Sequence, residues 1–346
     1  MAELDIEQFL NYSDLFPIID VRSPGEYQAG HISGSCNVPL FNDEERALIG
    51  TCYKLQRRKT AISYGLDMVG PKLSEFVNSA EKIAKDNTVL VHCWRGGMRS
   101  GSFSWLVNIA GLKSYILKKG YKAYRNYSLN FLGNLNNLVL LGGETGSGKT
   151  EMLQKLKEAG EQVIDLENLA CHKGSSFGSL PGIQQPTTEQ FQNDLFEQLR
   201  KMNHTRRIWM EDESHNIGKV FLPDNLWWKM RASPVIRLLR SKEKRVQNLI
   251  NNYGNLDYDS LKKSIERISK RLGGLNTSLA IQCLENKDLY QVASLCLNYY
   301  DKAYNSGLRH RKQSLILNLD ADHQDSQILI RDTLYMADTY TRKVVV

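Results

Sequence analysis

The sequence has few cysteines and no long apolar run, and each scarcity excludes a class of protein. Its six cysteines are irregularly spaced and form no CxxC pair, which argues against a zinc site or a disulfide framework. No run of about 18 or more apolar residues occurs, so we expect no membrane-spanning segment and no membrane partner. The start, Met1 to Phe9, carries three acids and does not resemble a secretory signal peptide. We therefore expect a cytoplasmic protein, in which a free thiol can act as a nucleophile.

The 346 residues, 41% hydrophobic and 24% charged, suggest two domains, or three small ones, of ordinary globular composition. In the first part, apolar strands are expected at residues 16–21 and 87–92, and helices at 72–85 and 100–110. This alternation predicts an α/β fold with a mainly parallel sheet and helices on both faces. The segment Ser128 to Asn137 is rich in asparagine and glycine, which is typical of a linker. We place the domain boundary there, giving domains 1–131 and 132–346.

A cysteine ends the second of these strands and begins a glycine-containing loop. Cys93 is followed by Arg95, Gly96, Gly97 and Arg99, and then by the expected helix. Glycines allow backbone N–H groups to line an anion-sized cup, and the helix N-terminus and two arginines add positive charge. Such surroundings lower the pKa of a thiol. We interpret Cys93, Arg95 and Arg99 as catalytic residues, the alternative being a buried structural cysteine.

The second part opens with the strand 138–141 and a complete G-x-x-x-x-G-K-[ST] motif that leads into a helix at 149–159. This context is the one in which a P-loop cradles phosphates. The predicted phosphate-binding residues of the loop are Gly143, Thr145, Gly146, Ser147, Gly148, Lys149 and Thr150. Lys149 would contact the terminal phosphate. Any diphosphate suits this loop, an isoprenyl diphosphate included, because we find no adenine-binding motif. The alternative is a chance glycine-rich turn.

Acids follow a later strand, expected at residues 207–210. Glu211 and Glu213, with Asp212 between them, form the candidate acidic site, which would hold Mg²⁺ or orient a water molecule. We identify no secure metal site and no tightly bound cofactor, although Thr150 is the candidate Mg²⁺ ligand. The alternative is an acidic turn. Beyond about residue 240 the pattern is helical.

The net charge of +7 is concentrated in residues 237–271, which contain ten Lys and Arg against four Asp and Glu. On a helix expected at 261–271, Lys263, Arg267 and Lys270 share one face. The candidate contacts to a phosphate backbone are Arg240, Lys244, Lys263, Arg267 and Lys270, and the stretches 118–125 and 309–312 add further basic residues. The alternative is a solvated charged surface.

The first domain resembles rhodanese domains. The segments that carry the resemblance are Ile19 to Tyr27, Gly30 to Ser35 and Asn37 to Pro39. Rhodaneses carry sulfur as a persulfide on the loop cysteine, so the resemblance implies that Cys93 is a carrier or nucleophile. Five residues separate Cys93 from Arg99, where the common sulfurtransferase loop has four. The longer loop resembles that of dual-specificity phosphatases of the same fold, and phosphate, selenophosphate or a larger chalcogen substrate would fit it.

The pairing of a rhodanese loop with a P-loop resembles the tRNA 2-selenouridine synthase family over nearly the whole chain. Further matching segments are Asp165 to Glu167, Leu169-Ala170, His172 to Gly178, Gln185-Pro186, Glu211, Glu213-Ser214, Ile217-Gly218 and Tyr299 to Asp301. His172 and Lys173 thereby join the predicted phosphate-binding set. Lys173 stands where arginine is expected, which keeps the charge but loses a bidentate fork.

The resemblance implies a transferase. The family converts 2-thiouridine to 2-selenouridine at the wobble position of tRNAs for Lys, Glu and Gln, with selenophosphate as donor. It also geranylates the same sulfur with geranyl diphosphate, and the S-geranyl product is the intermediate that selenium displaces. The P-loop domain would hold the diphosphate, the rhodanese-like domain would act through Cys93, and one tRNA would bridge both.

Three other functions would account for part of the sequence. A phosphatase of the cysteine–arginine type would need a general acid, which we cannot identify, and would leave the P-loop without a role. A kinase fused to a degenerate rhodanese domain would turn over ATP without tRNA. A non-catalytic tRNA-binding protein would use the P-loop as a switch and would not need Cys93.

Overall fold

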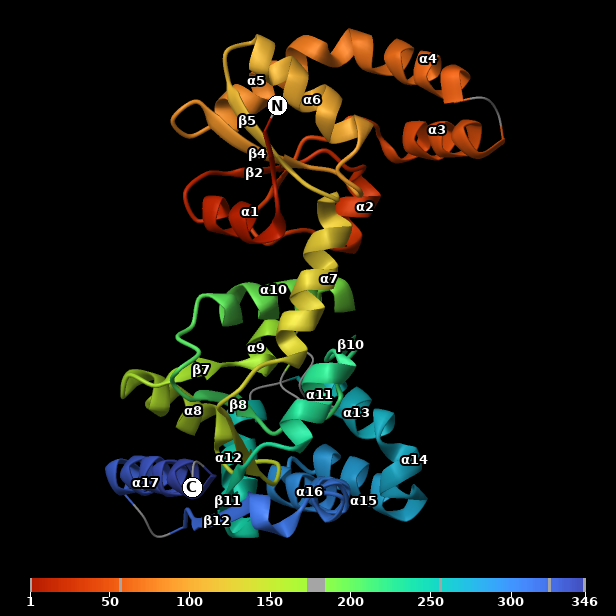
Figure 1. Ribbon diagram of the computed structural model, residues 1–346. Coiled ribbons are helices and arrows are strands. Elements are labelled where there is room, and N and C mark those ends of the chain that lie inside the picture. Colours follow the sequence, from red (N-terminus) through yellow and green to blue (C-terminus); the bar gives the residue numbers. More distant parts are fainter. Residues whose placement is uncertain (1, 56–57, 173–183, 255–256, 323–324, 345–346) are drawn as a thin grey trace. The chain divides into compact units, whose positions relative to one another are not determined.

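The structure is a computed structural model that describes residues 2–55, 58–172, 184–254, 257–322 and 325–344. The chain divides into two compact units, Met1–Phe131 with Gln192–Glu197, and Leu132–Phe191 with Gln198–Val346. Each unit contains a five-stranded parallel sheet with helices around it (Figure 1). The predicted α/β fold class is therefore confirmed. No helix in the described ranges is both long and apolar enough to cross a membrane.

The first unit builds its sheet in the order β1-β5-β4-β2-β3. Its elements are β1 (Ala2–Leu4), α1 (Ile6–Ser13), β2 (Ile18–Asp20), α2 (Pro24–Ala29), β3 (Cys36–Asn37), α3 (Asp43–Leu55), α4 (Arg58–Val69), the 3-10 helix η1 (Gly70–Lys72), α5 (Leu73–Ile83), β4 (Thr88–His92), α6 (Met98–Ile109), β5 (Lys113–Leu117) and α7 (Gly120–Gly133). The paired α3 and α4 have no counterpart in the sequence-based prediction.

The core of this unit follows the two-residue period of its strands. Val89 and Val91 of β4 point to the face covered by α5 and α6, where Phe76 and Phe103 pack with them. Leu90, between the two valines, is equally buried but points to the opposite face. Both faces are therefore covered, and β4 delivers Cys93 from the middle of a rigid sheet.

The predicted linker at Ser128 to Asn137 is wrong for most of its length, because α7 continues through Gly133. Tyr121, Tyr124 and Leu132 of α7 are fully buried. Burial of these side chains outweighs the weak helix propensity of the asparagines and the glycine.

The second unit builds its sheet in the order β12-β11-β6-β8-β7, with β6 in the centre. Its elements are β6 (Leu138–Gly143), α8 (Lys149–Glu158), β7 (Gln162–Ile164), α9 (Leu166–Leu169), α10 (Thr188–Arg200), β8 (Ile208–Glu211), β9 (Asn216–Ile217), β10 (Val220–Phe221), α11 (Asp224–Arg231), β11 (Val235–Leu239), α12 (Lys242–Tyr253), α13 (Tyr258–Arg267), α14 (Ser269–Leu272), α15 (Gly274–Glu285), α16 (Leu289–Arg309), η2 (Gln313–Leu315), β12 (Ile316–Asp320) and α17 (Ser326–Val344). The central part of α10 groups with the first unit.

The C-terminal region is largely helical, as predicted, with two corrections. Residues 316–320 form the edge strand β12, which pairs in parallel with β11. The helix expected at 261–271 is broken at Ile268, where α13 ends and the short α14 begins. Helices α13 to α16 share an apolar core of their own, in which Ile265, Val292 and Cys296 are buried.

Candidate active sites

The thiol of Cys93 lies between β4 and α6, at the position that the sequence predicts. It is 4% exposed, and its Sγ lies 3.2 Å from Oγ of Ser100. Burial raises the pKa of Cys93, but the Ser100 hydroxyl, the N–H groups of Gly97 and Ser100 and the charge of Arg99 together lower it below its usual value. The surroundings therefore stabilise a thiolate.

Two glycines allow the loop to close around the thiol. Gly96 and Gly120 have φ values of +63° and +58°, in the left-handed region that glycine tolerates. A Cβ atom on Gly120 would lie only 2.3 Å from the carbonyl oxygen of Cys93. The backbone N–H of Tyr121 donates to that same oxygen at 2.8 Å. The first turn of α7 thus supports the loop by direct backbone contact.

The two arginines of this loop have different surroundings. Arg99 is half-buried and donates to Glu26 through Nη1 (2.6 Å) and Nη2 (3.4 Å). Burial raises the pKa of Glu26, but the bonds from Arg99 hold it below its usual value. Glu26 thus positions Arg99 and offsets its charge. Arg95 is exposed at the rim of the loop.

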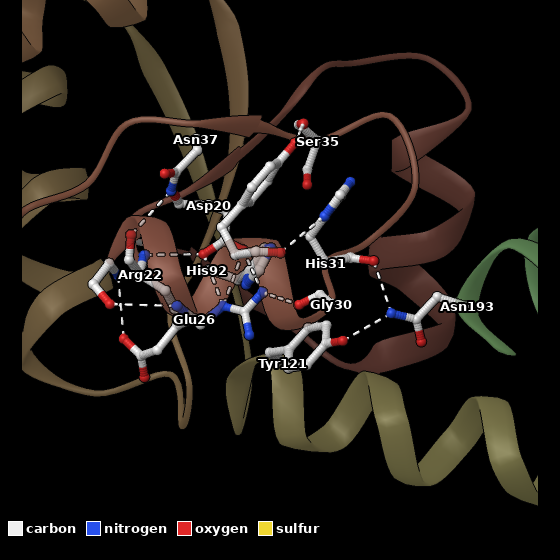
Figure 2. A network of polar contacts seen from close by, with 12 residues as sticks. Asp20, Arg22, Glu26, Gly30, His31, Ser35, Asn37, His92, Tyr121 and Asn193 are labelled. Atoms are coloured by element: carbon white, nitrogen blue, oxygen red, sulfur yellow. Dashed lines mark hydrogen bonds and ion pairs between the residues drawn. The ribbon is translucent and has the colours of Figure 1, made fainter. Parts of the chain in front are cut away.

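A buried polar network lies beside the loop on β2 and β4 (Figure 2). Arg22 donates to both carboxylate oxygens of Asp20 and to the carbonyl of Gly30, and its guanidinium lies 3.8 Å from the ring centroid of Tyr121. Burial lowers the pKa of His92 to about 4, so this ring is neutral at pH 7. The network fixes the segment that the rhodanese resemblance singled out, and we assign it a structural role.

The P-loop connects β6 to α8, and all seven predicted loop residues line a cavity of about 610 Å³. Lys149 Nζ donates to the carbonyl of Gly143 at 2.9 Å. Gly146 and Gly148 have φ values of +83° and +87°, which turn their peptide groups as the motif requires. The hydroxyl of Tyr304 accepts the N–H of Gly143 at 2.8 Å. The cavity is therefore bordered by backbone donors, a lysine and a helix N-terminus.

Glu144 anchors the P-loop to the helical region. It accepts from Arg237 (3.3 Å), Arg245 (3.3 Å) and Asn305 (3.0 Å). Arg245 also pairs with Asp301 through two bonds of 2.7 and 2.9 Å. Two of the basic residues between 237 and 271 thus hold the loop rather than face solvent.

The predicted acidic residues divide between three environments. Glu211 is fully buried and accepts the N–H of Leu166, and burial raises its pKa well above the usual value. Asp212 borders the cavity but pairs with the buried Arg311 at 2.6 Å. Glu213 also lines the cavity, and Glu167 joins it there. The acidic site at the phosphate cavity is therefore best described by Glu213 and Glu167.

Glu167 was not among the predicted site residues, although it lies in a segment quoted for the resemblance. Burial, followed by the charge of Glu213, raises the pKa of Glu167 to about 7, against the opposing effect of Lys149. Thr150 Oγ1 donates to Glu167 Oε2 at 3.4 Å. Among the described residues, no group of three or more His, Cys, Asp or Glu side chains is arranged to hold a metal ion.

The remaining predicted residues lie in several places. His172 is half-buried and is not among the residues that line the cavity, and Lys173 lies outside the described residues. Arg240 lies against the P-loop, since a Cβ on Gly148 would be 3.3 Å from its Nη1. Lys244 is exposed and donates to the carbonyl of Asp322.

Lys263, Arg267 and Lys270 are all exposed, on α13 and α14. Each of the other two basic stretches has one arginine engaged within the protein, while its lysines are exposed. Arg311 is buried, and Arg125 donates to Asn193 and Gln192.

Several residues that line the cavity are not predicted from the sequence, because they come from helices distant along the chain. They are Trp227 and Arg231 of α11, Asn248 and Tyr253 of α12, and Tyr300 and Tyr304 of α16. Tyr300 lies in a segment quoted for the resemblance; no spacing in the sequence connects the others to the P-loop.

Comparisons with known proteins identify both regions. Residues 136–331 match the family described as tRNA 2-selenouridine synthase AAA domain, and residues 5–127 match the rhodanese-like domain. The tRNA 2-selenouridine synthase of Shewanella denitrificans is 32% identical over 340 residues, covering 88% of this chain and 91% of its own. That of Bordetella petrii is 33% identical, covering 93% and 95%. A crystal structure of an N-terminal domain from Clostridium difficile 630 is 38% identical over 36% of this chain and 98% of its own, with a TM-score of 0.34.

Proposed function

The chain belongs to the tRNA 2-selenouridine synthase family, and on this basis we propose that it converts 2-thiouridine at the wobble position of tRNAs for Lys, Glu and Gln to 2-selenouridine. The observation that carries the proposal is the presence, in one chain, of a loop that stabilises a thiolate and a P-loop that borders a cavity of about 610 Å³. Neither loop alone accounts for a replacement of sulfur by selenium.

The proposed first step alkylates the sulfur of the base with geranyl diphosphate. The sulfur attacks C1 of the geranyl group, the C1–O bond breaks, diphosphate leaves and the base loses its N3 proton. Lys149, the loop N–H groups and the N-terminus of α8 bind the leaving diphosphate and stabilise its growing charge. Alkylation makes the sulfur a better leaving group for the next step.

Thr150 and Glu167 provide oxygen ligands of the kind that Mg²⁺ prefers, and Mg²⁺ bound with a diphosphate takes only one or two ligands from the protein. We propose that these two residues hold such an ion, which would offset part of the charge of the diphosphate.

The proposed second step uses selenophosphate as selenium donor. The selenium of selenophosphate attacks C2 of the base, the C2–S bond breaks and geranyl thiol leaves with the proton of selenophosphate. Water then cleaves the P–Se bond, which releases inorganic phosphate and returns a proton to N3. The N–H groups and the hydroxyl that stabilise the Cys93 thiolate also suit an oxyanion, so the Cys93 loop handles selenophosphate or the displaced thiol. The exposed Lys263, Arg267 and Lys270 contact the tRNA backbone.

Two measurements test the proposal. Mass spectrometry of wobble uridines from cells with and without the protein should show selenouridine only when it is present. Calorimetry should show that Lys149→Ala weakens geranyl diphosphate binding by about tenfold or more, since a charge-assisted contact is lost. Lys157→Ala, at the exposed end of the same helix, is the control and should bind normally. Unchanged affinity in Lys149→Ala, or a loss confined to ATP, would contradict the role of the P-loop.

A further inference from the structure

A second, apolar pocket adjoins the phosphate cavity of the P-loop unit. It measures about 50 Å³ and lies among α12, α13, α16 and the P-loop. Thr145, Leu249, Tyr253 and Tyr300 line both spaces, so the small pocket begins where the phosphate cavity ends. The other residues around it are Ile250, Gly254, Leu261, Leu289, Val292, Ala293 and Cys296.

The lining of this pocket suits a hydrocarbon and not a nucleobase. Apart from Thr145 and the two tyrosines, the side chains that line it are aliphatic or, in Cys296, a thiol. Burial raises the pKa of Cys296 to about 12, so this thiol is uncharged and behaves as a small apolar group. A purine placed there would leave its ring nitrogens and exocyclic groups without partners, which opposes binding.

The size of the pocket sets a limit on what can enter. A volume of 50 Å³ holds roughly four water-sized groups, at about 10–15 Å³ each. This is close to the five carbons of one isoprene unit. A chain of two units would place its first unit between Thr145 and Tyr300, beside the diphosphate, and its second unit in the pocket. A third unit would exceed this volume and would have to displace lining side chains, among which Val292 and Cys296 are buried.

We propose that this pocket receives the terminal isoprene unit of the prenyl diphosphate held by the P-loop, and that Val292 and Cys296 at its wall restrict the chain to two units. The inference rests on the proposed function in one respect, that a prenyl diphosphate is the ligand of the P-loop. It adds the position of the hydrocarbon chain and the residues that select its length.

Filling the pocket tests the inference. Ala293 lines it from a half-buried position on α16, so Ala293→Leu occupies the space without replacing a core residue. Calorimetry with the full chain should show geranyl diphosphate binding weakened at least tenfold, because the loss of about two buried carbons suffices for that factor. Inorganic diphosphate should bind to Ala293→Leu with the same affinity as to the parent protein. Ser306→Leu, at an exposed position on the same helix that lines neither space, is the matched control.

Enlarging the pocket gives the reciprocal test. Val292→Ala should increase the affinity for farnesyl diphosphate relative to geranyl diphosphate several-fold. If Ala293→Leu leaves geranyl diphosphate binding unchanged while the parent binds it more tightly than inorganic diphosphate, the inference is wrong and the proposed function stands. If the parent binds geranyl diphosphate no more tightly than inorganic diphosphate, the proposed function is wrong, and the inference is wrong with it. If Ala293→Leu weakens ADP and not geranyl diphosphate, the pocket belongs to a nucleotide.

Discussion

Gly120 supports the Cys93 loop through its backbone. Its replacement by alanine tests whether that support is needed for the lowered pKa of Cys93. The residue has φ +58°, where alanine costs about 1–2 kcal/mol relative to glycine. The new Cβ would also lie 2.3 Å from the carbonyl oxygen of Cys93 and 2.5 Å from the nitrogen of Gly96. Both neighbours are backbone atoms that cannot rotate away, so overpacking adds roughly 1–3 kcal/mol. We expect Gly120→Ala to destabilise the first unit by about 2–5 kcal/mol.

Gly111 is the matched control, because it has φ +96° and a Cβ added there would meet nothing within 4 Å. Gly111→Ala therefore carries the conformational cost alone, about 1–2 kcal/mol. Stability is measured by urea unfolding of the full chain, with hydrogen exchange over residues 88–100 to follow this unit. The pH profile of Cys93 alkylation, resolved by peptide mass spectrometry, should move towards that of an ordinary thiol only in Gly120→Ala. Equal destabilisation and unchanged alkylation in both variants would refute the reasoning.

Three further predictions address the chemistry and the tRNA surface. Cys93→Ser should abolish selenation and spare geranylation, measured by mass spectrometry of the modified tRNA; full selenation by the variant would exclude a role for the thiol. Ser100→Ala should raise the pKa of Cys93, since a hydrogen bond to the charged thiolate is lost. The pKa of Cys93 is lower in the folded protein than in the unfolded chain, which adds to stability at a pH above the unfolded pKa. This contribution is lost as the pH falls through the folded pKa. Ser100→Ala should therefore destabilise the protein more at pH 9 than at pH 6. Replacing Lys263, Arg267 and Lys270 by alanine should flatten the salt dependence of tRNA binding by about two units, and parallel lines for variant and parent would assign them to a solvated surface.

The sequence predicts the conformation of the Cys93 loop and of the P-loop because each is determined by neighbouring residues. At both, an apolar strand ends, a glycine adopts a positive φ and a helix begins, as at Gly96 and Gly148. Strand burial and the conformational freedom of glycine act over fewer than about ten residues, so a linear pattern contains the information.

The features that the sequence does not predict depend on distant partners. Strand β12 forms because Ile316–Asp320 pairs with β11 at the edge of the sheet, and its short pattern lies within a region dominated by helices. Arg311 lies in a basic run but is buried against Asp212, 99 positions earlier. No periodicity reveals such a pair, because burial of a charge is decided by the tertiary partner that compensates it.

Ion pairs of this kind also engage some of the basic residues that give the chain its positive net charge. Arg237 and Arg245 count towards the net charge of residues 237–271, yet both pair with Glu144 of the P-loop, and Arg240 lies against Gly148. Arg237 and Arg245 are therefore paired with carboxylates within the protein, and Arg240 is held beside the P-loop, so the three offer less charge to a polyanion in solvent than their number suggests. The basic surface that residues 237–271 offer to a polyanion is therefore smaller than the sequence count implies, and Lys263, Arg267 and Lys270 are among its exposed members. Changes at Arg245 should accordingly affect diphosphate binding, whereas changes on α13 should affect the salt dependence of tRNA binding.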